Sequence, residues 1–404
     1  MRYNPFKPGS IIHPGMFAGR IDELKVLERA LFQTQNGNAE NFLIHGERGI
    51  GKSSLLMVVK YYASGQIKTL GGNIYNFLTV SVELEPNDSY NDLVHKVARE
   101  LQRELNKSEA IQKLLKDTWK FLTNWEVLGV KYNRENVPQD AMLEELSDKF
   151  ISIALKLKEK GQGIFLFIDE ADKAPVTSGL GEFVKLFSER LTKQGANNVG
   201  IGIVGISNVI NKMRASHESS VRSLTPIELA PLKPDERKQV VERGLKEAAE
   251  KNKDRVEIVE NALGLISRLS EGYPHFIQQY AYCAFEEDTD NLITLKDVIG
   301  GLGGEHGALT QLGIKFFENM YTVEICSDDY RTVLQVIAEH SPKSVQRKTI
   351  LGESGLKKYT VDNALTALKK RGSVIAVSGQ KGLYRLPSHS FATWIKAFKK
   401  SKDV

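Results

Sequence analysis

Cysteine is scarce in this chain of 404 residues, which contains only Cys283 and Cys326. Two cysteines exclude a disulfide framework of the kind that stabilises small secreted domains, and they exclude a metal site built from thiolates. The sequence also has no apolar run that approaches the roughly 20 residues a membrane-spanning helix needs. No apolar signal core follows the first residues. We therefore expect a cytoplasmic protein that has no membrane partner.

Acidic residues are scarce near the end of the chain. Residues 341–404 contain fourteen Lys and Arg but only three acids, which are Glu353, Asp362 and Asp403. This segment carries a net charge of +11, and because the whole chain is +5, residues 1–340 carry −6. A strongly basic segment on a mildly acidic body favours nucleic acid or another polyanion as a partner. A lysine-rich surface that only aids solubility is the alternative.

The remaining composition is that of a folded protein. Hydrophobic residues make up 41% of the chain, which is enough to build buried cores. A length of 404 residues predicts two or three domains.

Residues 46–53 read Gly-Glu-Arg-Gly-Ile-Gly-Lys-Ser and match the phosphate-binding pattern G-x-x-x-x-G-K-[ST]. The apolar run 41–45 before them predicts a strand, and residues 54–60 predict a helix whose N-terminus faces the phosphates. An ordinary glycine-rich turn would leave Lys52 unexplained. Lys52 is expected to reach the β- and γ-phosphates of ATP, and Ser53 to bind Mg²⁺. The predicted nucleotide-binding residues of this loop are Gly46, Glu47, Arg48, Gly49, Ile50, Gly51, Lys52, Ser53 and Ser54.

A second apolar run, residues 164–168, ends in two carboxylates, Asp169 and Glu170. Continuous apolar residues are typical of a strand that is buried on both faces of a parallel sheet. Asp169 is predicted to hold Mg²⁺ directly or through water. Glu170 is predicted to act as the general base on the attacking water. The alternative is an acidic cap where the chain leaves the strand.

A third apolar run, residues 199–206, is followed by Ser207 and Asn208. A polar side chain at this point is predicted to lie between the two preceding loops and to touch the γ-phosphate or its water. Alternatively, Ser207 and Asn208 only cap the next helix.

These motifs resemble those of the AAA+ ATPases, in particular the branch of origin-recognition and initiator-type ATPases and its bacterial relatives, over most of residues 14–300. Residues 17–24, Phe-Ala-Gly-Arg-Ile-Asp-Glu-Leu, are similar to the family signature F-x-G-R-x-x-E-L. The resemblance implies that Phe17, Gly19 and Arg20 line the adenine side of the pocket.

The same resemblance assigns two further catalytic positions. Asn208 stands where the family has its sensor-1 residue. The segment 219–223 is similar to the one that carries the arginine finger, which makes Arg222 the candidate and Arg214 its competitor. A finger acts on ATP held by a neighbouring subunit, so a homo-oligomer is implied. Otherwise Arg222 is a surface residue in a loop.

Residues 231–237 resemble the start of the family's helical lid, and residues 271–277 resemble its sensor-2 segment. There the chain departs from the family pattern, because His275, preceded by Pro274, stands in place of an arginine. A proline-bearing lid that contacts nucleotide is typical of the STAND signalling ATPases. Since neutral histidine is a weaker phosphate ligand than arginine, the departure implies tight ADP binding or slow turnover. Alternatively, His275 only packs within the lid.

A mostly helical insertion is predicted over residues 88–160, because residues 92–104 and 142–157 show amphipathic spacing. Between these helices, a short hairpin is predicted to present Trp125, Leu128 and Val130. These apolar side chains either contact DNA or a partner, or belong to the core.

After the glycines of residues 300–307, which predict a flexible hinge, the pattern changes. Helices are predicted over residues 330–340, 348–352 and 357–370, and a hairpin joins residues 374–377 to 383–386. Three helices and a β-hairpin make a winged helix.

The resembled family carries a winged helix at this position, where it binds duplex DNA. The helix 357–370 is then expected in the major groove, with Asp362 and Thr366 also on its outward side. The predicted DNA-contacting residues are Lys357, Lys358, Tyr359, Asn363, Lys381 and Arg385. The rival is a protein-binding or autoinhibitory module, as in STAND proteins, and fold alone does not decide between them.

The sequence thus predicts an α/β fold: an AAA+ parallel-sheet core with an all-α lid and a C-terminal winged helix. The predicted boundaries are 1–230 for the core, 231–300 for the lid, 301–325 for a linker and 326–404 for the winged helix. The predicted function is a magnesium-dependent ATPase switch that associates with double-stranded DNA. A STAND-like signalling or defence regulator that recruits a partner protein, and a transposition-type ATPase that selects DNA targets, are the alternatives.

Overall fold

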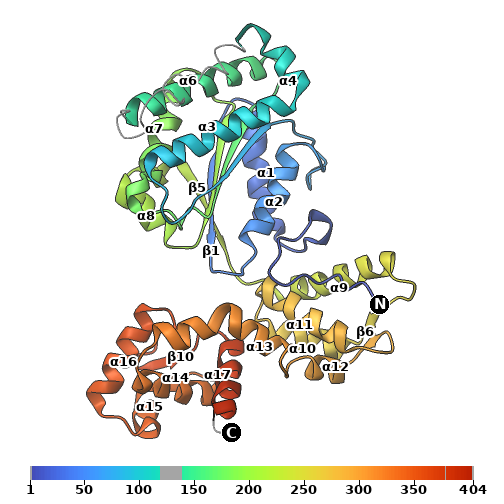
Figure 1. The fold of residues 1–404 in the computed structure, drawn as a ribbon, viewed down its shortest axis with the longest axis vertical. Helices are drawn as coiled ribbons and strands as arrows, with labels where there is room; N and C mark the ends of the chain where they lie inside the picture. Colours follow the sequence, from blue (N-terminus) through green and yellow to red (C-terminus); the bar gives the residue numbers. More distant parts are fainter. Residues whose placement is uncertain (1, 119–138, 378, 403–404) are drawn as a thin grey trace. The chain divides into compact units, whose positions relative to one another are not determined.

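A computed structural model describes residues 2–118, 139–377 and 379–402 of the chain. The chain forms two compact units (Figure 1). We call residues 11–230 the sheet unit, and residues 1–10 together with 231–404 the helical unit. The predicted hairpin with Trp125, Leu128 and Val130 lies outside the described residues.

The sheet unit is built on one parallel sheet with the strand order β2-β3-β4-β1-β5. This confirms the predicted α/β class and the three strands expected from the apolar runs 41–45, 164–168 and 199–206. The fifth strand escaped prediction because it contains Pro226. It pairs only with β1 at the edge of the sheet, where a residue without an N–H is tolerated. The strands are β1 (Asn41–Gly46), β2 (Leu78–Glu83), β3 (Ile164–Asp169), β4 (Val199–Gly205) and β5 (Leu224–Leu229).

Glycines in the middle strand β4 allow a layer of aromatic rings to cross one face of the sheet. A Cβ added at Gly200 would lie 2.5 Å from the ring of Phe165, and one added at Gly202 would lie 2.5 Å from the ring of Phe42. The rings of Phe165 and Phe167 stack with centroids 5.0 Å apart. These glycines are therefore needed for packing between strands and not for a turn.

Helices cover both faces of this sheet (Figure 1). Helices α1 and α2 pack on one face, and the apolar sides of α3, α6 and α7 form a continuous core with the other. Helix α3 begins with a capping box, in which Ser89 and Asp92 bond each other's backbone N–H. The helices are α1 (Ile21–Gln35), α2 (Lys52–Ala63), α3 (Tyr90–Lys107), α4 (Glu109–Leu114), α6 (Gln139–Lys158), α7 (Leu180–Lys193) and α8 (Val209–Ser216), with short 3-10 turns η1 (Pro14–Met16), η2 (Lys116–Thr118), η4 (Val176–Ser178) and η5 (Ser220–Ser223).

The helical unit contains the segment predicted as the lid and the segment predicted as the winged helix. Its first part comprises α9 (Pro234–Lys251), β6 (Glu257–Ile258), α10 (Glu260–Leu269), α11 (Pro274–Glu287), β7 (Leu292–Ile293) and α12 (Leu295–Gly300). Helix α13 (Ala308–Leu312) and two π-helical stretches, η6 (Gly313–Phe317) and η7 (Asn319–Glu324), follow. The last part comprises α14 (Asp328–His340), β8 (Val345–Gln346), α15 (Arg347–Ser354), α16 (Lys358–Lys370), β9 (Ile375–Ala376), β10 (Leu383–Arg385) and α17 (His389–Lys402).

The helices and the hairpin expected for a winged helix occur in the expected order in this last part. Strand β8 adds to the hairpin and gives a three-stranded sheet of order β8-β10-β9. Upstream, the glycine-rich segment 300–307 is a turn closed by backbone hydrogen bonds, from Ala308 N–H to the Gly301 carbonyl (2.9 Å) and from Gly307 N–H to the Gly304 carbonyl (3.2 Å). Its glycines permit close backbone contacts, which composition alone does not distinguish from flexibility.

Residues 1–10 belong to the helical unit, although the sequence prediction placed them in the ATPase core. The guanidinium of Arg2 binds the Asp288 carboxylate (2.5 Å) and the carbonyls of Phe285 (2.6 Å) and Asp288 (2.5 Å). Phe6 is buried against Gly244 of α9. These contacts join residues that are more than 200 positions apart, which no local pattern could predict.

No helix in the described parts of the chain is both long enough and apolar enough to span a membrane.

Substituting Gly244 with alanine should release residues 1–10. Alanine normally stabilises a helix interior by about 1 kcal/mol relative to glycine, but here the new methyl group would overlap the Phe6 ring. We expect Gly244→Ala to lower the melting temperature and to make the bond after Arg2 sensitive to trypsin. The matched control is Gly264→Ala in α10, where the nearest atom to the added Cβ is a nitrogen of the flexible Arg268 side chain at 3.5 Å. Equal effects of the two substitutions would contradict this packing.

Candidate functional site

Three loops with chemically active side chains meet at the carboxyl ends of β3, β4 and β1. These strands run parallel and lie next to one another in that order. The register pairs His45 of β1 with Gly205 of β4, and Ile168 of β3 with Ile203 of β4. The loops that leave the carboxyl ends of these strands therefore begin side by side. They carry the phosphate-binding motif, the pair Asp169 and Glu170, and Asn208.

The loop 46–53 has the backbone that its glycines predict. Gly49 and Gly51 have φ values of 79° and 95°, a region that residues with side chains rarely adopt. Helix α2 starts at Lys52 directly after this turn. The N–H groups of its first turn are thus available for an anion.

Arg20 holds this loop from the segment that precedes α1. Its guanidinium is buried, donates to the Ile50 carbonyl (3.2 Å) and pairs with Glu23 (3.1 Å). The same upstream segment is tied to α2, because the Ile12 N–H donates to the Ser54 hydroxyl (3.2 Å). The structure therefore brings Arg20 and Ser54 to the phosphate loop, where both contact protein backbone.

Lys52 is oriented by the loop itself. Its ammonium donates to the carbonyls of Gly46 (3.1 Å) and Glu47 (2.9 Å). Burial lowers the pKa of Lys52, and the nearby carboxylates of Asp172, Glu170 and Asp169 oppose this shift. Because burial removes part of the solvation of this ammonium, an anion beside Lys52 would favour its charged form.

Asp169 is buried at the end of β3, and its Oδ1 accepts the Glu170 N–H (2.8 Å). Burial raises the pKa of Asp169, and the neighbouring carboxylates of Glu170 and Glu83 act in the same direction. Glu83 ends β2 and stands opposite Asp169 in the register. Sequence reasoning missed Glu83 because only the pairing of the strands places it there.

Glu170 adopts a left-handed backbone conformation with φ of 52°. This conformation is unfavourable for a residue with a side chain and is found most often at functional sites. It follows directly from the sharp exit of the chain after β3. The side chain of Glu170 is half-buried.

Asp172 connects the loop after β3 to the loop after β4, a role that sequence reasoning also missed. Its Oδ1 accepts the Ile206 N–H (2.8 Å), and its carbonyl accepts a hydrogen bond from Lys212 (2.5 Å). Asn208 follows at the N-cap of α8, but its exposed side chain makes no capping hydrogen bond. The alternative in which the Asn208 side chain caps α8 is therefore wrong.

Comparison with known proteins agrees with this geometry. Residues 16–189 match the family model of the AAA ATPase domain. Over these residues the chain is similar to an AAA ATPase domain. The match includes the phosphate loop, Asp169 and Glu170, and it ends in helix α7.

The predicted resemblance to the origin-recognition branch is confirmed at the level of the fold. The Aeropyrum pernix ORC2 protein in its ADP form is 15% identical, with a TM-score of 0.51 over 98% of this chain and 97% of that chain. The same protein in ADPNP–ADP complexes is 15% identical, with a TM-score of 0.54 over 98% and 99%. One relative in sequence is an uncharacterized HTH-type transcriptional regulator of Methanocaldococcus jannaschii, which is 25% identical over 285 residues. That match covers 69% of this chain and 65% of the relative, slightly less than two thirds of its length.

Arg222 lies at the amino ends of the strands, opposite to the end at which the phosphate loop lies. It precedes β5, whose first residue, Leu224, pairs with Asn41 at the start of β1. A strand of six residues separates the two edges by roughly 17 Å. Arg222 is exposed, as is its competitor Arg214 in α8. Arg222 therefore does not complete the site of its own sheet unit.

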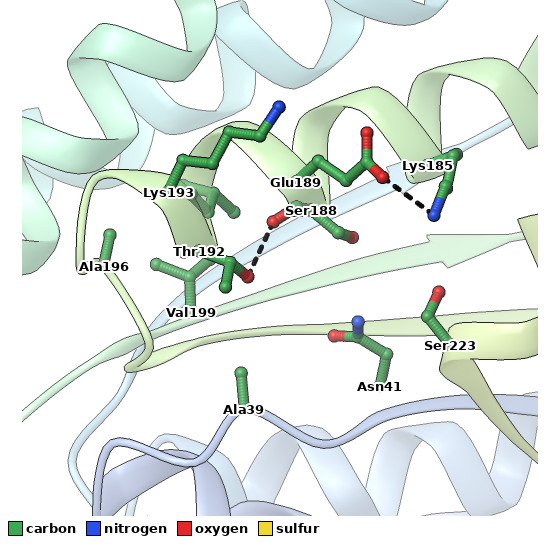
Figure 2. Close-up of a pocket in the computed structure, with 11 residues that line it drawn as sticks. Ala39, Asn41, Lys185, Ser188, Glu189, Thr192, Lys193, Ala196, Val199 and Ser223 are labelled. Carbon is green, nitrogen blue, oxygen red and sulfur yellow. Dashed lines mark hydrogen bonds and ion pairs between the residues drawn. The ribbon is translucent and has the colours of Figure 1, made fainter.

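A cavity of about 450 Å³ opens at the same edge as Arg222 (Figure 2). Within it, Lys185 pairs with Glu189 (2.9 Å), and the Thr192 hydroxyl donates to the Ser188 carbonyl (2.9 Å). The phosphate loop lies at the other end of the strands, and none of its residues lines this cavity. The cavity is lined by Ala39, Asn41, Lys185, Ser188, Glu189, Leu191, Thr192, Lys193, Ala196, Val199 and Ser223.

Pro274 and His275 lie in the helical unit, in the first turn of α11. Pro274 occupies the first helical position, where proline is favoured. The His275 ring packs edge-to-face on Phe316 with centroids 4.6 Å apart. Packing within the lid, the alternative for His275, is thus present in the structure, and contact of these residues with nucleotide stays a prediction.

All six residues predicted to contact DNA are exposed in the helical unit. Asp362, which was expected on the outward side of the same helix, is instead held by Arg347 through two bonds of 2.6 and 2.7 Å. This bidentate pair joins the first residue of α15 to the middle of α16. It fixes the angle between these helices and leaves a surface whose exposed charged groups are mainly basic.

ATP binding should become weaker at alkaline pH because of Lys52. Burial lowers the pKa of this ammonium from its ordinary value of 10.5, and phosphate binding, which favours the charged form, raises it again. We expect proton uptake on binding of ATP and magnesium at about pH 9, where free nucleotide is fully ionised, and less uptake near neutral pH. Calorimetry in two buffers of different ionisation enthalpy measures the uptake. Equal proton uptake at both pH values, or none, would show that Lys52 is not the group that meets the phosphates.

Proposed function

We propose that this chain is a magnesium-dependent ATPase switch that assembles on ATP binding and associates with duplex DNA through residues 326–404. The observation that carries the proposal is the meeting of the phosphate loop, the Asp169–Glu170 pair and Asn208 at one edge of the sheet. Each of these groups matches a different requirement of phosphoryl transfer.

The proposed roles follow from the chemistry of each group. Lys52 stabilises charge on the β- and γ-phosphates, and the amides of the phosphate loop bind the phosphate oxygens. Glu170 accepts a proton from the attacking water, and Asn208 orients that water or the γ-phosphate. Phe17, Gly19 and Arg20 lie in the segment proposed for the adenine side.

The residues present fit a magnesium ion. Ser53 offers a hydroxyl oxygen at the start of α2, and Asp169 offers a buried carboxylate at the end of β3. Mg²⁺ is usually bound through one or two such oxygens together with substrate phosphates. The ion would offset charge on the phosphates when it is bound.

Self-assembly is supported by the position of Arg222. A finger at the amino edge of the sheet reaches a nucleotide only if it belongs to a neighbouring copy of the chain. Hydrolysis would then require assembly, and the loss of the γ-phosphate would favour release. ATP drives this cycle only to the extent that it binds the assembled state more tightly.

DNA association is supported by the charge and exposure of the C-terminal part. Residues 341–404 carry +11, and Lys357, Lys358 and Asn363 are exposed on or next to α16. Asn363 is suited to pair with adenine, and the lysines with guanine or phosphate. Lys381 and Arg385 on the hairpin would hold the DNA backbone.

The arginine finger is tested by comparing Arg222→Ala with Arg214→Ala. We expect Arg222→Ala to retain ATP binding but to lose about three orders of magnitude in turnover, whereas Arg214→Ala retains activity. Native mass measurement of the wild type and of Glu170→Gln, with ADP and with ATP, shows whether ATP forms a larger particle that the Glu170→Gln substitution traps. A particle of constant monomer mass would remove the role of Arg222.

DNA binding is tested by salt titration of a duplex of mixed sequence. Replacing Lys357, Lys358 and Lys381 with alanine should weaken binding to every sequence. The slope of log affinity against log salt concentration should fall in magnitude by about 2 to 3, close to 0.9 for each lost phosphate contact. Lys246→Ala with Lys253→Ala, both exposed on α9 and the loop after it, is the control. Absence of duplex affinity in the wild type would favour the STAND-like alternative, in which this part of the chain binds a protein.

A further inference from the structure

The carboxylate of Glu271 caps helix α17 from a distant part of the helical unit. Its Oε2 accepts the His389 N–H at 2.6 Å, and the Ser390 N–H also donates to this carboxylate. His389 and Ser390 are the first two residues of α17. A negative charge at a helix N-terminus is favourable, because the first N–H groups of the helix have no partner within it.

The other N–H groups at the start of α17 are satisfied locally. The Phe391 N–H donates to the Ser388 hydroxyl (3.0 Å), and the Ala392 N–H donates to the Ser388 carbonyl (3.2 Å). Glu271 therefore supplies the acceptor that the local sequence does not provide. Without it, two N–H groups at the start of α17 would lose their acceptor.

A second polar contact joins the same two elements. The buried Ser390 hydroxyl donates to the Leu269 carbonyl (3.0 Å) and accepts a hydrogen bond from the Tyr280 hydroxyl (2.8 Å). Leu269 ends α10, and Tyr280 lies in α11. Helix α17 is thus bonded to the turn between α10 and α11 and to the helix that follows this turn.

The turn itself is held in a constrained conformation. Glu271 has a left-handed φ of 50°, and Gly272 has a φ of 88°. A Cβ at Gly272 would lie 2.6 Å from the Leu232 carbonyl oxygen, so the turn cannot relax easily toward this side. Left-handed glutamate is unfavourable, and the capping bond is the observed interaction that holds this side chain in place.

Pro274 and His275, which the sequence predicts to contact nucleotide, begin two residues after Gly272. Their surroundings continue to α17 through aromatic rings. His275 contacts Phe316 (4.6 Å between centroids), and the adjacent Phe317 contacts Phe391 (5.1 Å). One short turn is therefore connected to α17 both by a carboxylate and by packed rings.

We propose that Glu271 is a positioning residue that couples the nucleotide-contacting turn of the lid to the DNA-contacting part of the chain. The inference rests on the proposed function. A change of the turn on nucleotide exchange moves the carboxylate, and α17 follows its cap. Helix α17 packs on α14, and α14 packs on α16, so the displacement reaches the helix that carries Lys358, Tyr359 and Asn363.

The cap is tested first without any ligand, by amide hydrogen exchange at His389 and Ser390. In Glu271→Ala and in Glu271→Gly we expect exchange at these two amides to be at least about tenfold faster, the effect of losing a hydrogen bond to a charged acceptor. Exchange should change less at the amides of Phe391 and Ala392, which donate to Ser388. The control is Glu257→Ala, which removes an exposed carboxylate of the same unit. Unchanged exchange at His389 and Ser390 would overturn the proposal.

The coupling is tested by the ratio of duplex affinities measured with ADPNP and with ADP. Coupling between sites commonly changes affinity by about 5- to 150-fold, and we expect a ratio of this order in the wild type. In Glu271→Gly it should approach one, while the affinity for ADP stays within about threefold of the wild-type value. A structural role without coupling would weaken both duplex affinities equally, and that result would refute the proposal.

Failure of the proposed function and failure of the coupling give different results. A wild-type protein that binds no nucleotide or no duplex would refute the proposed function, and the exchange experiment would still decide whether the cap exists. A wild type that binds both ligands with a ratio of one would refute only the coupling. The amide oxygen of Glu271→Gln can still accept a hydrogen bond. Retention of the wild-type ratio in this variant would show that the coupling depends on the hydrogen bond and not on the negative charge.

Discussion

The parallel pairing of β1, β3 and β4 is the constraint on which the candidate site depends. Since the three strands point the same way, the loops that follow them begin at one edge, and Lys52, Glu170 and Asn208 are brought near one another from distant parts of the chain. Gly200 and Gly202 make this pairing compatible with the aromatic layer. Loss of the register would therefore disperse the site, even if every loop kept its own conformation.

Charged side chains at helix ends have a comparable role in the helical unit. Arg2 binds carbonyl groups at the end of α11, and Glu271 binds N–H groups at the start of α17. Each charge has the sign that the helix terminus favours. The partners are far apart in sequence, so these bonds contribute to tertiary structure as well as to the stability of single helices.

The sequence was sufficient for features that depend on short, chemically demanding patterns. The phosphate loop, the carboxylates after β3 and the helices α14, α15 and α16 follow from glycine placement, hydrophobic periodicity and turn residues. The sequence was not sufficient for features that depend on which strands pair or on which loops are in contact. Pro226 concealed β5, Glu83 joins Asp169 only through the register, and Asp172 acts through a backbone N–H of another loop. Neither the packing of residues 1–10 on α9 nor the cap on α17 leaves a local signal.

The membership of residues 1–10 in the helical unit has a consequence for synthesis of the protein. Phe6 and Arg2 are synthesised before their partners, Gly244 and Asp288, which are made more than 230 residues later. At about 5–20 residues per second, this interval is on the order of tens of seconds. During it, the sheet unit can complete its core, while Phe6 is without the surface of α9 against which it packs. Residues 1–10 therefore pack onto the helical unit late, after residues 244 and 288 have been synthesised.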